Sequence, residues 1–194
     1  KISWNEAYSK IFDKISITAS DKIAGITGDM TNMETLYIIK DFFDKTIKSN
    51  NLDSRNENYY VNSSSRNNYI FNSKISGIED ADLIFLIGTN PRYEATILNS
   101  RIRKTYINKN INVYSLGPVG DITYPYITLE NSTKTIKDII NNNHELSKVI
   151  DTAKKPMFII GQSALKQSSS IYLLEELKKY LKKNNKINDD WNSL

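Results

Sequence analysis

Five carboxylates lie where acid–base chemistry would need them, near the ends of expected strands or the starts of expected helices. They are Asp29, Glu34, Glu79, Asp80 and Asp82. Two nearby carboxyl groups can act as acid and base when their surroundings separate their pKa values. Asp29 and Glu34 also suit the first turn of a helix, where the dipole favours negative charge. The run 79–82 suits a solvated turn before a buried strand, so the pattern indicates structural roles more strongly than a catalytic pair.

Two glycine-containing loops could present backbone N–H groups to a phosphate. They are Gly25–Gly28 and Gly88–Asn90, and each precedes an expected helix. Neither matches the glycine fingerprint of dinucleotide-binding folds or a P-loop with its Gly-Lys-Ser/Thr ending. Glycine also permits a tight strand-to-helix turn with no ligand involved, and this simpler interpretation is the stronger one.

Four cations fall on one expected helix and are candidate contacts for an anion or an acidic partner surface: Arg92, Arg101, Arg103 and Lys104. Arg92 stands in the first helical turn, where a positive charge is unfavourable unless it has a partner. A solvated face or a salt bridge between domains is the alternative. His144 follows three asparagines at an expected break between helices and is predicted to be a surface cap.

The amino-acid composition excludes several kinds of metal site and catalytic group. The 194 residues include no cysteine and one histidine, which excludes thiolate-bound zinc, iron–sulfur clusters, thiol nucleophiles and disulfides within this chain. No apolar run approaches the roughly 20 residues of a membrane span. The net charge of +4 is spread too thinly to indicate nucleic-acid binding. The 28 Ile, 23 Asn and 21 Lys against 5 Arg are typical of an AT-rich genome.

Apolar periodicity predicts alternating strands and helices. Ser3 and Glu6 predict the capped start of a first helix, and Thr31–Glu34 a second capping box before a helix to about 48. Asn90 and Pro91 predict the start of a helix to about 106. A helix from about 133 is expected to break at 141–143 and to end before 155. The last helix spans 168–183, with Ile171, Leu174, Leu177 and Leu181 on one face. Strands are expected at 22–28, 83–88, 110–116 and 157–161, with a strand-like core at 59–61 and an irregular loop over 119–131.

Strands that alternate with helices indicate an α/β fold with a doubly wound, mostly parallel sheet and flanking helices. In such folds ligands bind at the carboxyl ends of the strands. The chain is expected to form one domain over 1–183, with a polar insertion at 49–65 and a polar, frayed tail at 184–194.

Several colinear segments carry a resemblance to a known family. The most specific is RNNYIFNSKISGIEDADLIFLIGTNPRYE at 66–94, and the others are Ile2–Ala7, Asn99–Lys104, Leu116–Tyr124, Lys154–Met157 and Gly161–Leu165. Together they resemble the large iron–sulfur subunit of respiratory complex I (NADH dehydrogenase subunit eleven), in its molybdopterin-oxidoreductase-like region. The resemblance covers nearly the whole chain apart from 49–65.

The resemblance implies a molybdopterin-oxidoreductase-like fold whose relatives in complex I have lost the pterin. In that family the amino-terminal part holds iron–sulfur clusters on cysteines. No cluster ligand carries over to this chain, so no catalytic, cofactor or metal residue is expected in it. Clusters and FMN are expected in partner subunits or in the remaining part of the subunit. The chain is expected to be the product of a split gene or part of a longer subunit.

The function implied is a structural, non-catalytic part of the matrix-side peripheral arm of complex I, at the mitochondrial inner membrane or on the cytoplasmic side of a bacterial one. Expected partners are other peripheral-arm subunits, including the cluster-bearing part of the same subunit. One alternative is a fragment of an active molybdopterin oxidoreductase such as a formate dehydrogenase, with a serine as metal ligand. A second is a free-standing nucleotide-binding module.

Overall fold

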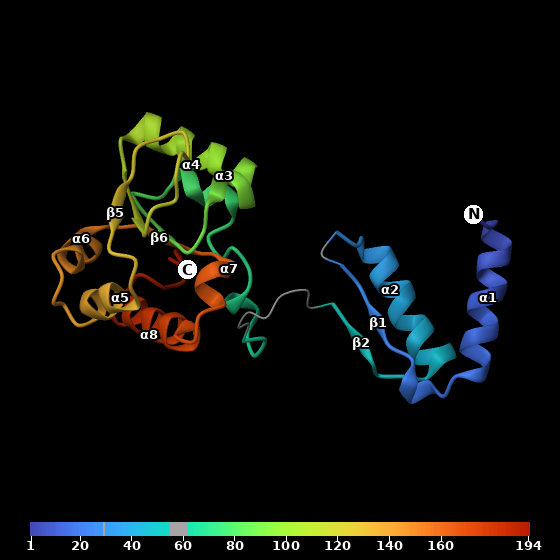
Figure 1. The fold of residues 1–194 in the computed structure, drawn as a ribbon. Helices are drawn as coiled ribbons and strands as arrows, with labels where there is room; N and C mark the ends of the chain where they lie inside the picture. The colour runs from blue at the N-terminus through green and yellow to red at the C-terminus, as the bar shows by residue number, and fades with distance from the viewer. Residues whose placement is uncertain (29, 55–61) are drawn as a thin grey trace. The chain divides into compact units, whose positions relative to one another are not determined.

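The chain forms two compact units, Lys1–Asn58 and Tyr59–Leu194, shown in Figure 1. The computed structural model describes residues 1–28, 30–54 and 62–194. The sequence suggests one domain over 1–183, whereas the division between units falls inside the polar stretch 49–65. That stretch has few apolar side chains with which to build a core. The strand-like segment expected at 59–61 and Asp29 lie outside the described residues.

The first unit contains two helices and a short pair of parallel strands. Helix α1 (Trp4–Ile17) begins at Ser3, whose Oγ accepts a hydrogen bond from the Glu6 N–H at 3.2 Å, as predicted. After the 3-10 turn η1 (Ser20–Lys22), strand β1 (Gly25–Ile26) pairs with β2 (Leu52–Asp53). The strand is therefore much shorter than the expected 22–28.

Helix α2 (Met33–Phe42) continues into a π-helical turn, η2 (Phe43–Ile47), so the predicted helix to about 48 is confirmed. Its cap differs from the prediction. Asn32, not Thr31, is the N-cap, and its side-chain oxygen accepts from the Thr35 N–H at 2.9 Å. Either residue suits this position.

A small apolar core holds the first unit together. Phe43 and Ile47 are its buried apolar side chains, at 7% and 3% exposure. Helix α1 contributes no buried residue, and Trp4 is 77% exposed.

The second unit is built on a four-stranded parallel sheet of order β5-β4-β3-β6. The strands are β3 (Leu83–Ile87), β4 (Asn112–Leu116), β5 (Ile127–Leu129) and β6 (Pro156–Ile160). All five residues of β3 are buried, as a continuous apolar run in a sheet covered on both faces requires. The doubly wound α/β prediction is confirmed.

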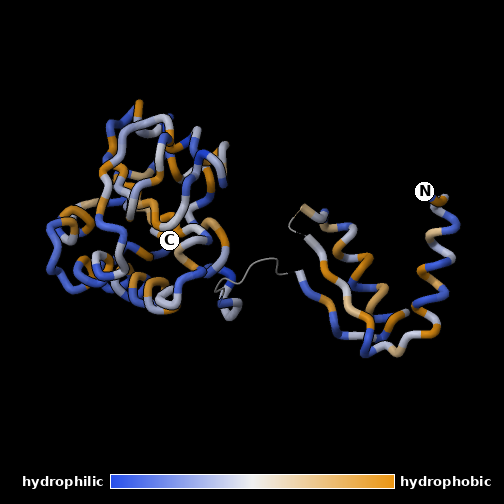
Figure 2. Tube along the Cα trace, in the orientation of Figure 1, coloured by the Kyte–Doolittle hydropathy of each residue, from blue (hydrophilic) through white to orange (hydrophobic). Residues whose placement is uncertain are grey.

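Helices cover both faces of this sheet (Figure 1). One face packs on α5 (Thr133–Ile140), α6 (Leu146–Thr152), α7 (Gln162–Leu165) and α8 (Ser170–Lys183). The other packs on α4 (Thr96–Lys109) and the 3-10 turn η4 (Ile75–Glu79). The short helix α3 (Pro91–Glu94) precedes α4, and η3 (Arg66–Asn68) precedes η4. Hydrophobic residues gather along the strands between these layers (Figure 2).

Most predicted helices of this unit are confirmed, with local differences. The helix expected from 91 to about 106 is divided at Ala95, whose φ of −152° and ψ of 69° are not helical. The break at 141–143 separates α5 from α6 as predicted. On α8, Ile171 is 54% exposed and Leu173 takes the expected place in the core.

Two segments expected to lack regular structure are ordered parts of the sheet layer. The loop expected over 119–131 includes β5, which pairs with β4 at the sheet edge. The prediction that the tail at 184–194 frays is wrong, because this segment packs against β6. Trp191 is 7% exposed, its Nε1–H donates to the Pro156 O at 2.8 Å, and the Ser193 O accepts from the Phe158 N–H. Trp191 therefore anchors this mostly polar segment, and Ile187 and Leu194 add apolar contacts with the core.

Candidate functional site

Three strands of the second unit end in glycine at the same edge of the sheet. Gly88, Gly117 and Gly161 follow β3, β4 and β6. The backbone segments at Gly88 and Gly161 lie very close to each other. A Cβ atom at Gly161 would lie 2.3 Å from the Gly88 O, and the Ser163 hydroxyl donates to that same oxygen. Only glycine allows this approach.

Two adjoining hollows of about 360 and 310 Å³ lie at these strand ends. Gly88, Leu116, Asn131 and Ser163 line both of them. Each is large enough for a small ligand, and the position is the one where doubly wound folds bind theirs. This edge is the candidate site.

The Glu94 carboxylate accepts hydrogen bonds from two donors, of Thr89 and Asn90, that could otherwise bind an anion at this site. Its Oε1 accepts from the Asn90 N–H at 2.7 Å, and its Oε2 accepts from the Thr89 hydroxyl at 3.0 Å. Among the described residues that line the two hollows, Glu94 is the sole charged one. In the β3–α3 turn, one of the two loops that could have presented N–H groups to a phosphate, a carboxylate of the same chain thus binds the donors. This agrees with the stronger expectation of a turn with no ligand.

The second candidate loop, Gly25–Gly28, uses its backbone in the β1–β2 pair. The Gly25 N–H donates to the Asn51 O at 2.8 Å and the Thr27 N–H to the Asp53 O at 3.0 Å. The Gly28 O accepts from the Thr31 N–H at 3.1 Å. Glycine here serves close packing, since a Cβ at Gly25 would meet the Phe43 ring at 2.8 Å.

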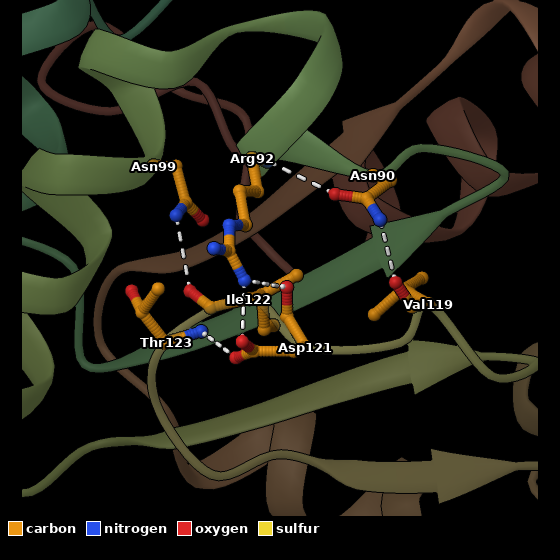
Figure 3. A network of polar contacts seen from close by, with 7 residues as sticks. All are labelled: Asn90, Arg92, Asn99, Val119, Asp121, Ile122 and Thr123. Atoms are coloured by element: carbon orange, nitrogen blue, oxygen red, sulfur yellow. Dashed lines mark hydrogen bonds and ion pairs between the residues drawn. The ribbon is translucent and has the colours of Figure 1, made fainter.

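The chain after β4 is fastened to α3 and α4 by three side chains (Figure 3). The Asn90 amide donates to the Val119 O at 2.6 Å, and the buried Asn99 amide donates to the Ile122 O at 3.0 Å. The Arg92 guanidinium donates to the Asp121 O at 3.1 Å and forms an ion pair with its carboxylate.

These contacts hold the segment 119–122 against the start of the helices. The same network extends into the core. The Tyr124 hydroxyl donates to the Asn99 Oδ1 at 2.9 Å, and burial raises the pKa of Tyr124 well above its usual range. Sequence reasoning did not single out Glu94, Asn99 or Tyr124. A glutamate four residues after the helix cap and a polar residue on the apolar face of α4 are the signals that could have found them.

The four predicted cations do not converge on one site. Arg92 pairs with Asp121. Arg101 and Lys104 both reach Glu79, at 2.7 and 2.8 Å, and tie α4 to η4. Arg103 is exposed, and within the described ranges it has no ion-pair partner. Three of the four therefore meet carboxylates of this chain.

The predicted carboxylates also have structural partners. Asp80 pairs with Lys155 at 3.3 Å. Asp82 accepts from the backbone N–H groups of Lys154 and Lys155, at 2.6 and 3.0 Å, and so holds the turn before β6. Glu34 lies in the first turn of α2.

His144 caps the start of α6, where its Nδ1 accepts from the Leu146 N–H at 3.2 Å, as predicted. Over residues 1–28, 30–54 and 62–194, no group of three or more His, Asp or Glu side chains could hold a metal ion. In the same part of the chain, no helix is long and apolar enough to cross a membrane.

The Glu79 cluster makes a prediction about acid stability. The hydrogen bond from Lys104 and the charge of Arg101 lower the pKa of Glu79. A carboxyl whose pKa is lower in the folded state stabilises the fold above its unfolded pKa, and this contribution disappears as the pH falls through the folded pKa. The free energy of unfolding of a Glu79→Gln variant should therefore be lower than that of the wild type at pH 7, and the two should converge at an acid pH below the lowered folded pKa of Glu79. Urea unfolding at both pH values measures this, with Glu145→Gln as an exposed control. Equal differences at both pH values would contradict it.

Comparison with known proteins supplies the family. The molybdopterin oxidoreductase family model matches residues 1–194. The chain is 37% identical over 191 residues to the G subunit of NADH-quinone oxidoreductase from Rickettsia prowazekii, covering 98% of this chain and 28% of that protein. It is 32% identical to the NADH-ubiquinone oxidoreductase 75 kDa subunit of Reclinomonas americana, covering 98% of this chain and 30% of the relative.

A plant relative shows a similar identity and a similar coverage. The mitochondrial NADH dehydrogenase [ubiquinone] iron-sulfur protein 1 of Solanum tuberosum is 31% identical, and the match covers 100% of this chain and 26% of that protein. The chain thus spans between about a quarter and a third of the relatives it matches. These matches confirm the resemblance carried by segments such as 66–94, and the chain belongs to the molybdopterin oxidoreductase family.

Proposed function

We propose that the chain is a non-catalytic supporting part of the peripheral arm of respiratory complex I, NADH:ubiquinone oxidoreductase. Its relatives at 31–37% identity carry complex I subunit names. In this proposal it supports the cluster-bearing part of its subunit and neighbouring subunits, which hold the iron–sulfur clusters and FMN. The complex lies at the mitochondrial inner membrane on the matrix side, or on the cytoplasmic side in a bacterium.

The observation that carries a non-catalytic role is the position of Glu94. A pterin dinucleotide would bring phosphate groups to the strand ends, where the family fold predicts its site. There the Thr89 hydroxyl and the Asn90 N–H already bind the Glu94 carboxylate. No Lys or Arg is among the described residues that line the two hollows, so nothing in them offsets repulsion between this carboxylate and a phosphate. The residues present do not fit the cofactor.

The same charge argument disfavours the nucleotide-binding alternative, because a nucleotide phosphate would meet the same carboxylate. The active-oxidoreductase alternative carries the expectation of a serine of this chain as metal ligand. Ser163 is the serine common to both hollows, and its hydroxyl is engaged with the Gly88 O.

Native purification of the complex that contains this chain tests the proposal. We expect mass spectrometry to find cluster-binding and flavin-binding subunits in the same particle. Elemental analysis should find iron without stoichiometric molybdenum or tungsten. A stoichiometric molybdenum or tungsten content together with a pterin would overturn the non-catalytic role. A particle that lacks flavin and iron–sulfur subunits would overturn the assignment to complex I.

A further inference from the structure

Strand β6 forms one edge of the four-stranded sheet, and its outer side is only partly paired. The Phe158 N–H points outward and donates to the Ser193 O at 2.7 Å, whereas the Gly161 N–H points inward and donates to the Ile87 O at 2.8 Å. Successive residues of a strand alternate between its two neighbours. The Ile160 N–H therefore points outward like that of Phe158. Among the described residues, the contacts on this outer side are those of Ser193 with the Phe158 N–H and of Trp191 with the Pro156 O, and neither reaches Ile160.

A groove of about 660 Å³ lies beside this outer side of β6. Much of its lining is apolar, from the loop before η4, from β6 itself and from α7 and α8: Ile70, Phe71, Ile159, Ile160, Leu165 and Leu174. Ile70 is one of these lining residues and is 39% exposed. An unpaired strand edge beside an apolar groove is the arrangement that accepts an added strand.

The rim of the groove carries one sign of charge. Lys178 and Lys182 of α8 are the charged residues among the described ones that line it. Lys178 donates to the Asn68 Oδ1 at 2.6 Å. Lys182 is exposed and forms no ion pair within the part of the chain that the structure describes. An occupant with acidic side chains would complement this rim.

We propose that this groove binds an extended strand with alternating apolar and acidic side chains, which pairs with the backbone of Ile160. The strand comes from the rest of the subunit. The matched relatives are three to four times as long as the matched region, so most of the polypeptide in such a subunit lies outside these 194 residues. This assignment of the strand's source rests on the proposed function.

Hydrogen exchange on the 194-residue chain tests the pairing. The probes are a peptide of alternating valine and glutamate, and overlapping peptides of about 10 residues. The overlapping peptides tile the Rickettsia prowazekii relative outside its matched region. We expect at least one of these tiles, and the alternating peptide, to bind and to slow exchange of the Ile160 amide about tenfold or more. The Gly161 amide, already bound to Ile87, should change little.

Variants on α8 test the recognition of charge. Lys182→Glu should weaken binding of the alternating peptide about fivefold at low salt. Lys183→Glu, on the same helix but outside the groove lining, should weaken it less than Lys182→Glu does, and the contrast should be clearest near 0.15 M salt, where the Debye length is about 8 Å.

Each outcome decides a separate part of the proposal. Absence of binding by every probe, or binding that leaves Ile160 exchange unchanged, would overturn strand addition. Binding of the alternating peptide but of no tile would overturn the assignment to the rest of the subunit. Protection of Ile160 in a dimer of the chain, seen by light scattering without any peptide, would assign the groove to a second copy instead. None of these results depends on the co-purification that tests the complex I role.

Discussion

Replacing Trp191 with alanine is expected to destabilise the second unit by about 3–5 kcal/mol. The indole is buried against the sheet face that carries Ile84 and Met157, so its removal leaves a large cavity. Its Nε1–H also satisfies the Pro156 O at 2.8 Å, and the substitution leaves that carbonyl without this donor. Loss of the anchor should free the Ser193 O from the Phe158 N–H and open the edge of β6.

Urea unfolding followed by far-ultraviolet circular dichroism measures this destabilisation. Asp190→Ala is the matched control, because the neighbouring side chain is exposed, and it should change the free energy of unfolding by less than about 0.5 kcal/mol. A Trp191→Ala variant that loses less than about 1 kcal/mol would show that the segment 184–194 is not an integral part of the fold.

Replacing Gly161 with alanine should cost about 3 kcal/mol, through steric overlap alone. Gly161 has φ −92° and ψ 171°, an extended backbone that alanine adopts without strain. The added Cβ would lie 2.3 Å from the Gly88 O and 2.5 Å from the Thr89 Cβ. To relieve this overlap, the ends of β3 and β6 must separate, and the Gly161 N–H bond to the Ile87 O would be lost.

Gly120→Ala is the matched control, because Gly120 has a backbone angle that is strained for alanine but free space around it, whereas Gly161 has a backbone that is unstrained for alanine and no free space. The φ of Gly120 is +73° and nothing lies within 4 Å of the position that an added Cβ would take, so only conformational strain of about 1 kcal/mol is expected. Equal losses for the two variants in urea unfolding would show that β3 and β6 do not approach as closely at this edge as the structure has them.

Several local features were predictable because they depend on neighbours in the sequence. The start of α1 at Ser3, the start of α3 at Asn90 and Pro91, and the histidine cap of α6 follow from side chains that satisfy nearby backbone groups. The run Leu83–Ile87 predicts a fully buried strand, because both of its faces are apolar. These features do not depend on contacts with residues that are distant in the sequence.

Other features depend on contacts between distant residues. Trp191 lies in a polar segment, and the apolar cluster that it joins is built from residues far away in the sequence, on η4, β3, α4 and β6, so the segment alone predicts fraying. Strand β5 has three residues, of which two are exposed, and no apolar pattern marks it. It becomes a strand because β4 offers it a free edge.

The sequence by itself determined most of the order of strands and helices, except for β2, β5 and the division between α3 and α4, and, through segments such as 66–94, the family. It also excluded thiolate chemistry, since no cysteine is present. Only the tertiary structure decided what the candidate groups do. Arg92 meets Asp121 across 29 positions, and Arg101 meets Glu79 across 22, so each charge is neutralised by a residue that local spacing cannot identify. Whether a loop can bind a ligand depends in the same way on whether its hydrogen-bond donors are already bound to another side chain. At the β3–α3 turn they are bound to Glu94.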